Sequence, residues 1–164
     1  MLLTLNLKTK QKIKDKQTMP TTSHYFFEGT CKWAKVRKPD DYDKFTIDLY
    51  PTEESLILFR ESNISVGIRT DEDGDFLRFN RPRIKMIKDE EVDFGPPKVT
   101  DIDGFELEGL IGNGSKVIVK VSEFGPYNGR YGHRLEEVRV MDLVVYEGNA
   151  GTVEAIAPDS VKPW

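Results

Sequence analysis

Basic and aromatic side chains interleave in three stretches of the sequence. Residues 32–38 read Lys-Trp-Ala-Lys-Val-Arg-Lys, residues 78–85 read Arg-Phe-Asn-Arg-Pro-Arg-Ile-Lys, and residues 127–134 carry two tyrosines, two arginines and a histidine. This combination suits single-stranded nucleic acid, because cations neutralise phosphates while exposed rings stack on bases, each stack contributing roughly 1–3 kcal/mol. The predicted contact residues are Trp33, Lys35, Arg37, Tyr42, Arg78, Phe79, Arg81, Arg83, Lys85, Tyr127, Arg130, Tyr131 and Arg134.

Each of these stretches also has a purely structural interpretation. Trp33 and Phe79 suit a hydrophobic core as well as they suit base stacking, since large aromatic residues fill small barrels. The basic residues of the first stretch could simply cover a solvated strand face. Tyr127 and Tyr131 are the strongest candidates, because glycines and a proline surround them in a loop with little core to enter.

The sequence gives little support to catalysis. His24 and His133 are the only histidines, and neither lies near a serine or cysteine in a nucleophile pattern. Asp101 and Asp103 could hold magnesium for a nuclease, but paired carboxylates beside a glycine more often form a solvated turn. We therefore predict that the protein is not an enzyme and has no catalytic residues.

Two further motifs imitate ligand sites without the required spacing. Residues 71–75, Asp-Glu-Asp-Gly-Asp, lack the terminal bidentate glutamate of a calcium loop. Residues 109–116 lack the Gly-Lys-Ser/Thr order of a phosphate-binding loop, and a strand follows where a helix should. Both motifs predict tight turns, so no metal site and no cofactor is expected.

The elements that must position the contact residues are mostly strands. Residues 44–50 alternate, with Phe45, Ile47 and Leu49 on one face, and the valines of residues 116–124 alternate in the same way. Thr52 and the two glutamates after it predict the start of the one convincing helix, over residues 52–61. Strands are predicted over residues 25–37, 44–50, 64–70, 76–81, 116–124 and 134–146.

The remaining segments predict the domain organisation. Prolines interrupt residues 82–110, which we expect to be mostly loop with short strands near residues 83–87 and 105–108. We predict a disordered basic arm over residues 1–23, a single domain over residues 24–148, and a flexible C-terminal tail over residues 149–164. About five principal strands, one short helix and long loops predict a mainly β fold, a five-stranded Greek-key OB-fold barrel.

On such a barrel, the loop between the first two strands and the loop between the last two flank the binding face. We therefore expect residues 127–134 to face the loop of residues 37–42 across a groove. Gly29, in the middle of the first strand, predicts a bulge or bend.

Composition and charge indicate the cellular compartment of this protein and the distribution of its charge. One cysteine, Cys31, excludes an internal disulfide, and no apolar run approaches the roughly 18 residues of a membrane span, so a cytoplasmic protein is expected. The net charge is −4, yet residues 1–18 hold five lysines and one aspartate, so the rest of the chain sums to −8. A basic arm can add phosphate contacts.

Two segments of the sequence are distinctive, Leu-Ile-Gly-Asn-Gly-Ser at residues 110–115 and Arg-Leu-Glu-Glu-Val-Arg-Val at residues 134–140. They are the most specific parts of a resemblance, over residues 24–148, to phage-encoded single-stranded DNA-binding proteins of OB-fold type. It implies a protein of the host cytoplasm that coats single strands without sequence preference in replication, recombination and repair. It also implies contacts with phage replisome proteins.

One departure from that resemblance concerns the C-terminal tail. Relatives of this type often end in a strongly acidic tail closed by an aromatic residue, whereas this chain keeps the aromatic Trp164 with only Glu154 and Asp159 before it. Replisome docking through the tail therefore depends on Trp164. The acidic balance outside the arm keeps an alternative function open, a protein-interaction barrel that docks replication factors with weak or no DNA binding. The oligomeric state is also open, with a homodimer as one option.

Overall fold

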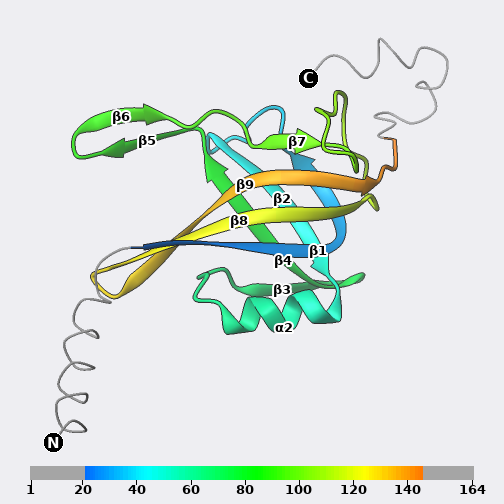
Figure 1. Cartoon of the computed structure of the whole chain (residues 1–164), viewed down its shortest axis with the longest axis horizontal. Helices are drawn as coiled ribbons and strands as arrows, with labels where there is room; N and C mark the ends of the chain where they lie inside the picture. The colour runs from blue at the N-terminus through cyan, green and yellow to red at the C-terminus, as the bar shows by residue number, and fades with distance from the viewer. Residues whose placement is uncertain (1–20, 146–164) are drawn as a thin grey trace, which may run out of the picture.

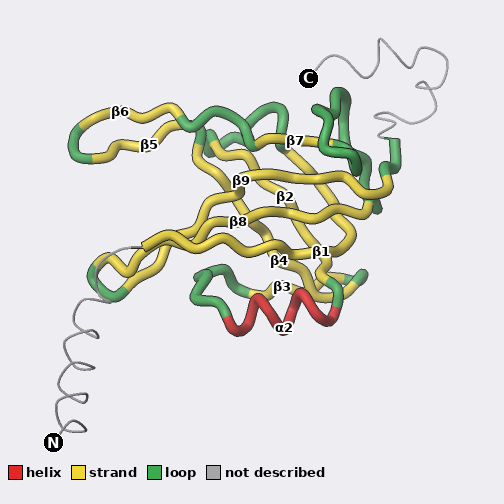
Figure 2. Tube along the Cα trace, in the orientation of Figure 1, coloured by secondary structure: helices red, strands yellow, loops and turns green. Residues whose placement is uncertain are grey.

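The computed structural model describes residues 21–145. Strands dominate this range and a single helix accompanies them, so the predicted mainly β fold with one short helix is confirmed (Figures 1 and 2). The elements are β1 (Thr21–Lys35), β2 (Lys44–Pro51), α2 (Glu53–Glu61), β3 (Ile68–Asp71), β4 (Gly74–Pro82), β5 (Ile84–Ile87), β6 (Glu90–Asp93), β7 (Lys98–Thr100), β8 (Lys116–Tyr127) and β9 (Arg130–Asp142).

One strongly curved sheet forms the body of the domain. Its strand order is β3-β4-β2-β1-β8-β9-β7, and every pair is antiparallel except β7 with β9. Strands β5 and β6 form a separate hairpin that projects from the body, and the β8–β9 hairpin projects beside it together with the start of β1 (Figure 1). Helix α2 packs against β1 and β2.

The curvature brings β4 close to β9, although the two strands share no backbone ladder within residues 21–145. The backbone N–H of Asn80 donates to Nε2 of His133 at 3.2 Å, and Arg81 donates to the carbonyl oxygen of Leu135 at 3.1 Å. The five long strands β1, β2, β4, β8 and β9 are thus neighbours in a partly rolled sheet. Because the sheet has two further strands and no closing ladder within the described residues, the five-stranded Greek-key barrel stays a prediction.

The core fills the inner face of the sheet. The predicted alternation is correct in β2, where Phe45, Ile47 and Leu49 are all buried. The rings of Phe27 and Phe79 stack at 5.5 Å between centroids, and Phe59 of α2 meets the Phe79 ring edge-on at 6.3 Å. Phe79 is completely buried, so its ring has no face to offer a base, and the prediction that it contacts nucleic acid is wrong.

The start of α2 follows the predicted capping chemistry. The Thr52 hydroxyl accepts a hydrogen bond from the Ser55 backbone N–H at 3.2 Å, which satisfies one of the free donors of the first turn. The Ser55 hydroxyl in turn accepts from the backbone N–H of Glu28 in β1 at 2.8 Å. This second bond joins the helix to the sheet.

Several local expectations need correction. Strand β1 begins at Thr21, so residues 21–23 belong to the sheet and not to an arm. Strands β6 and β7 were not predicted, and residues 105–108 form no strand beyond a single bridge at Glu106. Gly29 is needed for close approach instead of a bulge, because a Cβ there would lie 2.1 Å from the carbonyl oxygen of Tyr50. The irregularity in β1 lies between Lys32 and Lys35.

Some predictions concern residues outside the described range. The basic arm before Thr21, the C-terminal tail and Trp164 lie there. Within residues 21–145, no helix has the length and apolar character needed to cross a bilayer.

Candidate nucleic-acid interface

The outer face of β1, β2 and β4 carries a row of charged side chains opposite the core. Cross-strand register places Lys32 beside Asp48 and Asp48 beside Arg78, while Lys35 pairs with Thr46. Since successive strand residues point to opposite faces, these residues lie behind Cys31, Ile47, Leu49, Leu77 and Phe79 of the core. The outer face of these three strands is hereafter called the β1–β2–β4 face.

A pocket of about 300 Å³ opens on this face, lined by Trp33, Lys35, Asp40, Thr46, Asp48 and Arg78. Trp33 sits at the β1 irregularity with φ of 50° and a side chain that is 58% exposed. Its backbone N–H donates to Oδ1 of Asn113 at 2.8 Å. The indole ring is therefore presented to solvent at the mouth of a pocket that contains both cations and hydrogen-bonding groups.

Arg78 is fixed in place by Asp48. Nε and one terminal nitrogen of its guanidinium donate to the two Asp48 carboxylate oxygens, at 2.6 and 2.9 Å. The Asp48 residue is only 3% exposed, while the Arg78 side chain remains 42% exposed. A bidentate pair of this kind orients the guanidinium and raises the pKa of Arg78, and its outer edge stays open to a phosphate.

Two residues of this face were missed among the predicted contacts. Lys32 places its ammonium 5.2 Å from the centroid of the Tyr50 ring, and Tyr50 packs against Phe76 at 5.2 Å between ring centroids. The alternation of residues 44–50 already put Tyr50 on the face opposite the core, so the signal was present in the sequence. The Lys32 signal was weaker, because the β1 irregularity follows directly after it.

The loop of residues 36–43 adds one exposed ring beside the pocket. Tyr42 is 82% exposed, and its backbone N–H donates to Oδ1 of Asp40 at 2.8 Å. Arg37 behaves differently from the prediction, because its guanidinium donates to the carbonyl oxygens of Leu107 and of Gly109, the latter at 3.1 Å. Arg37 therefore links this loop to residues 107–109, and its guanidinium donors are mostly used by these two carbonyl oxygens.

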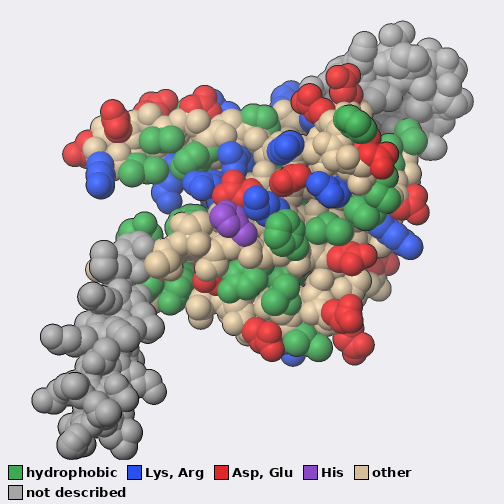
Figure 3. Space-filling view, in the orientation of Figure 1, with side chains coloured by type: hydrophobic (Ala, Val, Ile, Leu, Met, Phe, Trp, Pro, Cys, Tyr) green, Lys and Arg blue, Asp and Glu red, His purple; other side chains and the backbone are tan. Residues whose placement is uncertain are grey.

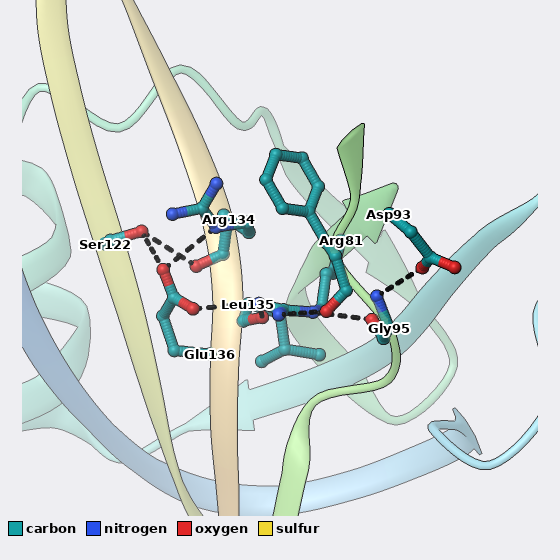
Figure 4. Close-up of polar contacts among 8 residues, drawn as sticks. Arg81, Asp93, Gly95, Ser122, Arg134, Leu135 and Glu136 are labelled. Atoms are coloured by element: carbon teal, nitrogen blue, oxygen red, sulfur yellow. Dashed lines mark hydrogen bonds and ion pairs between the residues drawn. The ribbon is translucent and has the colours of Figure 1, made fainter. Parts of the chain in front are cut away.

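Arg81 is a structural residue and not an accessible cation. It donates to the carbonyl oxygens of Phe94, Gly95 and Leu135 at 2.7, 2.9 and 3.1 Å, and to Oε1 of Glu136 at 2.8 Å (Figure 4). Its side chain is only 12% exposed. With its guanidinium shared among these acceptors, Arg81 joins β4, β9 and the segment after β6, and its predicted phosphate contact is wrong.

Glu136 connects this network to the β8–β9 hairpin. Its Oε2 accepts hydrogen bonds from the Ser122 hydroxyl at 2.6 Å and from Nε of Arg134 at 3.0 Å (Figure 4). Burial alone would raise the pKa of Glu136, but these bonds and the nearby arginines lower it below its usual value. The carboxylate therefore stays ionised and holds Arg134 in place.

Arg134 and Lys85 lie in the hollow between the two projecting hairpins. The guanidinium of Arg134 lies 4.5 Å from the centroid of the Phe94 ring and 5.6 Å from that of Phe124, and the Lys85 ammonium lies 5.8 Å from the Phe124 centroid. Figure 3 shows lysines and arginines gathered in this hollow, with carboxylates among them. Tyr127 and Arg130 are exposed at the hairpin tip, and Tyr131 is half-buried.

The expected pairing of the hairpin with the loop of residues 37–42 is not found among the contacts of the described residues. The contacts across the hollow instead come from Lys85 in β5 and from Phe94, which follows β6 directly. Arg83 stands near the base of that hairpin and is paired with Asp43, at 2.7 Å from Nε to Oδ1 and 3.1 Å for the second bond. Both partners are partly exposed, so this pair is open to solvent.

Asp101 makes structural contacts, and burial changes the pKa of Cys31 and of His133. Oδ1 of Asp101 accepts from the backbone N–H groups of Asp103 and Phe105 at 2.9 and 3.0 Å, which makes a turn. Burial raises the pKa of the Cys31 thiol to about 12 and lowers the pKa of His133 to about 4. Across residues 21–145, no group of three His, Cys, Asp or Glu side chains is arranged to hold a metal ion.

Comparisons with known proteins give a structural likeness only. No family model matches this sequence, and no curated protein does. The crystal structure of gp2.5, a single-stranded DNA-binding protein encoded by bacteriophage T7, is similar at 19% identity and a TM-score of 0.56, over 78% of this chain and 96% of that one. The single-stranded DNA-binding protein of bacteriophage Enc34 is similar at 14% identity and a TM-score of 0.50, over 83% and 90%. This chain therefore shares the OB-like fold of these phage single-stranded DNA-binding proteins.

Proposed function

We propose that this protein binds single-stranded DNA without sequence preference, through the β1–β2–β4 face and the basic hollow beside it. The observation that carries the proposal is the exposed indole of Trp33 at a pocket that also presents Lys35 and Arg78. An aromatic face stacks on any base, and the two cations neutralise the adjoining phosphates. The fold shared with T7 gp2.5 and the Enc34 protein supports the same function.

The geometry favours a single strand over a duplex. A ring stacks on Trp33 only if the base is free of its neighbours, and the bases of a duplex are already stacked on one another. The pocket, at about 300 Å³, is lined by Trp33 together with Lys35 and Arg78, so a base stacked on Trp33 would have two cations near its phosphates. Duplex DNA would meet only the cations, and it would meet them beside Asp40 and Asp48.

Arg37, Phe79 and Arg81 are taken up by structural contacts, and the other ten predicted residues fall into two groups. Those that present a ring or cation to solvent support DNA contact, and they are Trp33, Lys35, Tyr42, Arg78, Lys85, Tyr127 and Arg130. Arg83, Tyr131 and Arg134 are partly exposed, and Arg134 lies against the Phe94 and Phe124 rings in the hollow. A strand that follows these residues would run from the Trp33 pocket toward the β8–β9 tip, with phosphates along the cations.

We also propose that the protein has the biological role of a phage DNA-binding protein. Its role would be to protect single strands during replication, recombination and repair in the host cytoplasm, without catalysis of its own. Replisome proteins are the proposed partners, with Trp164 of the tail as their docking residue, and a homodimer is the proposed option for assembly. The phage origin of the structurally similar proteins supports this setting.

A fluorescence titration with dT oligomers of graded length tests the proposal. The variant Trp164→Phe leaves Trp33 as the only tryptophan, so the quenching reports on the pocket alone. We expect oligomer binding to quench this fluorescence and to weaken with salt, with a log–log slope of about −0.7 for each phosphate contact. Equal affinity for a duplex of the same length would contradict the proposal.

The acidic balance of the chain outside its basic arm favours one other function, a protein-interaction barrel that docks replication factors. Five of the eight predicted cations are engaged with carboxylates or carbonyl oxygens, which agrees with that alternative: Arg37, Arg78, Arg81, Arg83 and Arg134. A partner retained after nuclease digestion, together with no oligonucleotide binding, would favour it over DNA binding.

A further inference from the structure

The turn between β3 and β4 is acidic and folds back onto the β1–β2–β4 face. It consists of residues 71–75, Asp-Glu-Asp-Gly-Asp, whose four carboxylate residues are all exposed. The Tyr50 hydroxyl donates a hydrogen bond to Oδ2 of Asp71, and the Lys32 ammonium forms an ion pair with Oδ2 of Asp73. Glu72 has no such contact within the described part of the chain, and Asp75 accepts from the Thr70 hydroxyl at 2.7 Å.

The two groups held by this turn are ones that a DNA strand would use. Lys32 lies beside Asp48 in cross-strand register and Tyr50 packs on Phe76, so both extend the face that carries Arg78. A carboxylate and a phosphate offer the same kind of anionic oxygen acceptor to a lysine or a phenol. The acidic turn therefore occupies Lys32 and Tyr50 in the way that a phosphate would.

We propose that the acidic turn of residues 71–75 is a built-in competitor of DNA, which covers Lys32 and Tyr50 until a bound strand displaces it. This competition rests on the proposed single-strand binding, and it would regulate the binding of DNA to the β1–β2–β4 face. Lys32 and Tyr50 become further contact residues, available only after Asp73 and Asp71 release them. A ligand must supply the free energy that displaces the turn from Lys32 and Tyr50. Short or weakly charged anions therefore bind poorly at these two residues, whereas a long strand with many phosphates binds.

The turn can leave without disturbing the core. All four residues of β3 are exposed, and among residues 21–145 β3 is an edge strand that pairs only with β4. The turn is held together from within, because Oδ1 of Asp71 accepts from the Asp73 backbone N–H at 2.8 Å. Its contacts with Lys32 and Tyr50 are polar and border solvent, and such pairs exchange partners at little cost.

The charge states of these groups are consistent with the exchange. The hydrogen bond from Tyr50 lowers the pKa of Asp71, so that carboxylate is ionised at neutral pH. Partial burial and the Asp71 carboxylate raise the pKa of Tyr50 to about 12, so its hydroxyl keeps the proton that it donates. Asp73 raises the pKa of Lys32, which therefore remains a cation for either anion.

The exchange also predicts an unusual salt dependence. When Lys32 moves from Asp73 to a phosphate, the phosphate releases a cation and the freed Asp73 attracts one. These two effects largely cancel, so Lys32 adds little to the salt slope of the natural protein. Removal of the competing carboxylates should restore that contribution, and the log–log slope should steepen by up to about 0.7 for this one contact.

The test compares two double variants with the same gain in charge. Asp71→Asn with Asp73→Asn removes the carboxylates that hold Tyr50 and Lys32, while Glu72→Gln with Asp75→Asn changes the same turn without touching either contact. We expect the first variant to bind dT oligomers roughly two- to tenfold more tightly than the natural protein, because two exposed polar contacts no longer compete with the DNA. We expect the second to show less than half of that gain and an unchanged salt slope.

Lys32→Met provides the second measurement. In the natural protein it should change oligomer affinity little, whereas in the Asp71→Asn, Asp73→Asn background it should remove most of the gain. If circular dichroism shows that the double variant misfolds, the single variants Asp73→Asn and Glu72→Gln are compared instead. Each removes one negative charge, and only the first removes a contact with Lys32. Equal gains in oligomer affinity in the two double variants would contradict the proposal that the acidic turn competes with DNA. Failure of the natural protein and all variants to bind oligomers would contradict the proposed function instead.

Discussion

The backbone N–H of Trp33 donates a 2.8 Å hydrogen bond to Oδ1 of Asn113, a residue 80 positions later in the chain. This bond holds the β1 irregularity against the turn that precedes β8, where the backbone N–H of Cys31 also donates to the Ser115 carbonyl oxygen at 2.9 Å. Trp33 adopts φ of 50°, a conformation that is unfavourable for a large side chain. The Asn113 bond thus holds an exposed tryptophan in this conformation, which fits the proposed role of Trp33 in stacking on a base.

Replacement of Trp33 by glycine should separate binding from stability. Glycine adopts positive φ freely, so we expect a thermal midpoint equal to or above that of the natural protein. Loss of the ring should weaken oligo-dT binding by about 1–3 kcal/mol, roughly 5- to 150-fold. Anisotropy of a labelled oligomer measures the affinity without the tryptophan signal. Trp33→Phe, which keeps a ring, should retain most of the affinity, and full affinity in the glycine variant would remove Trp33 from the interface.

Phe79 should affect stability alone. Its ring is enclosed by Phe27 and Phe59, so truncation to alanine leaves a cavity and should lower the free energy of unfolding by about 3–5 kcal/mol. Phe105 is the matched control, because it is 70% exposed, and Phe105→Ala should change stability little. Urea unfolding compares the two variants. A Phe79→Ala protein as stable as the natural one would show that the Phe27–Phe59–Phe79 cluster is not the core.

Arg81 and Arg130 should give opposite results although both were predicted as phosphate contacts. Arg81→Met leaves Glu136 without one of its partners and frees three carbonyl oxygens, so we expect a loss of about 3–5 kcal/mol in stability with an unchanged salt slope. Arg130 is exposed at the hairpin tip, and Arg130→Met should leave stability unchanged while the log–log salt slope becomes shallower by about 0.7. A lower salt slope in folded Arg81→Met would restore it as a DNA contact.

These differences show how far the sequence can predict this molecule. Alternation located the core of β2 and β8, and capping residues located α2, because both signals depend on near neighbours in the chain. Alternation puts Arg78 on the opposite face from Phe79 and Arg81, but it could not tell that the Phe79 face is the buried one, since burial depends on the strands beside β4. The acceptors of Arg81 lie 13 to 55 positions away. Their convergence is a property of the fold, as is the parallel pairing of short β7 with β9.

His133 couples the stability of the domain to pH through its contact with β4. Its Nε2 accepts from the Asn80 backbone N–H, which requires that this nitrogen carry no proton. Burial, and then the charge of Lys44, lower the pKa of His133 from 6.5 to about 4, and Glu123 is its cross-strand neighbour. Because the folded pKa lies below the unfolded one, the stabilisation is complete above about pH 6.5 and declines as the pH falls toward 4.

His133→Gln should remove this pH dependence. Between pH 6.5 and 4, the unfolded chain binds a proton at this position and the folded protein does not, which adds a slope of about 1.4 kcal/mol per pH unit to the free energy of unfolding. Glutamine can accept the same hydrogen bond without titrating, so the variant should lose stability less steeply over that range in urea unfolding at a series of pH values. Exposed His24→Gln is the matched control and should follow the natural protein. Parallel pH profiles for His133→Gln and the natural protein would mean that His133 is protonated in the folded state, and the Asn80 contact would then have to be abandoned.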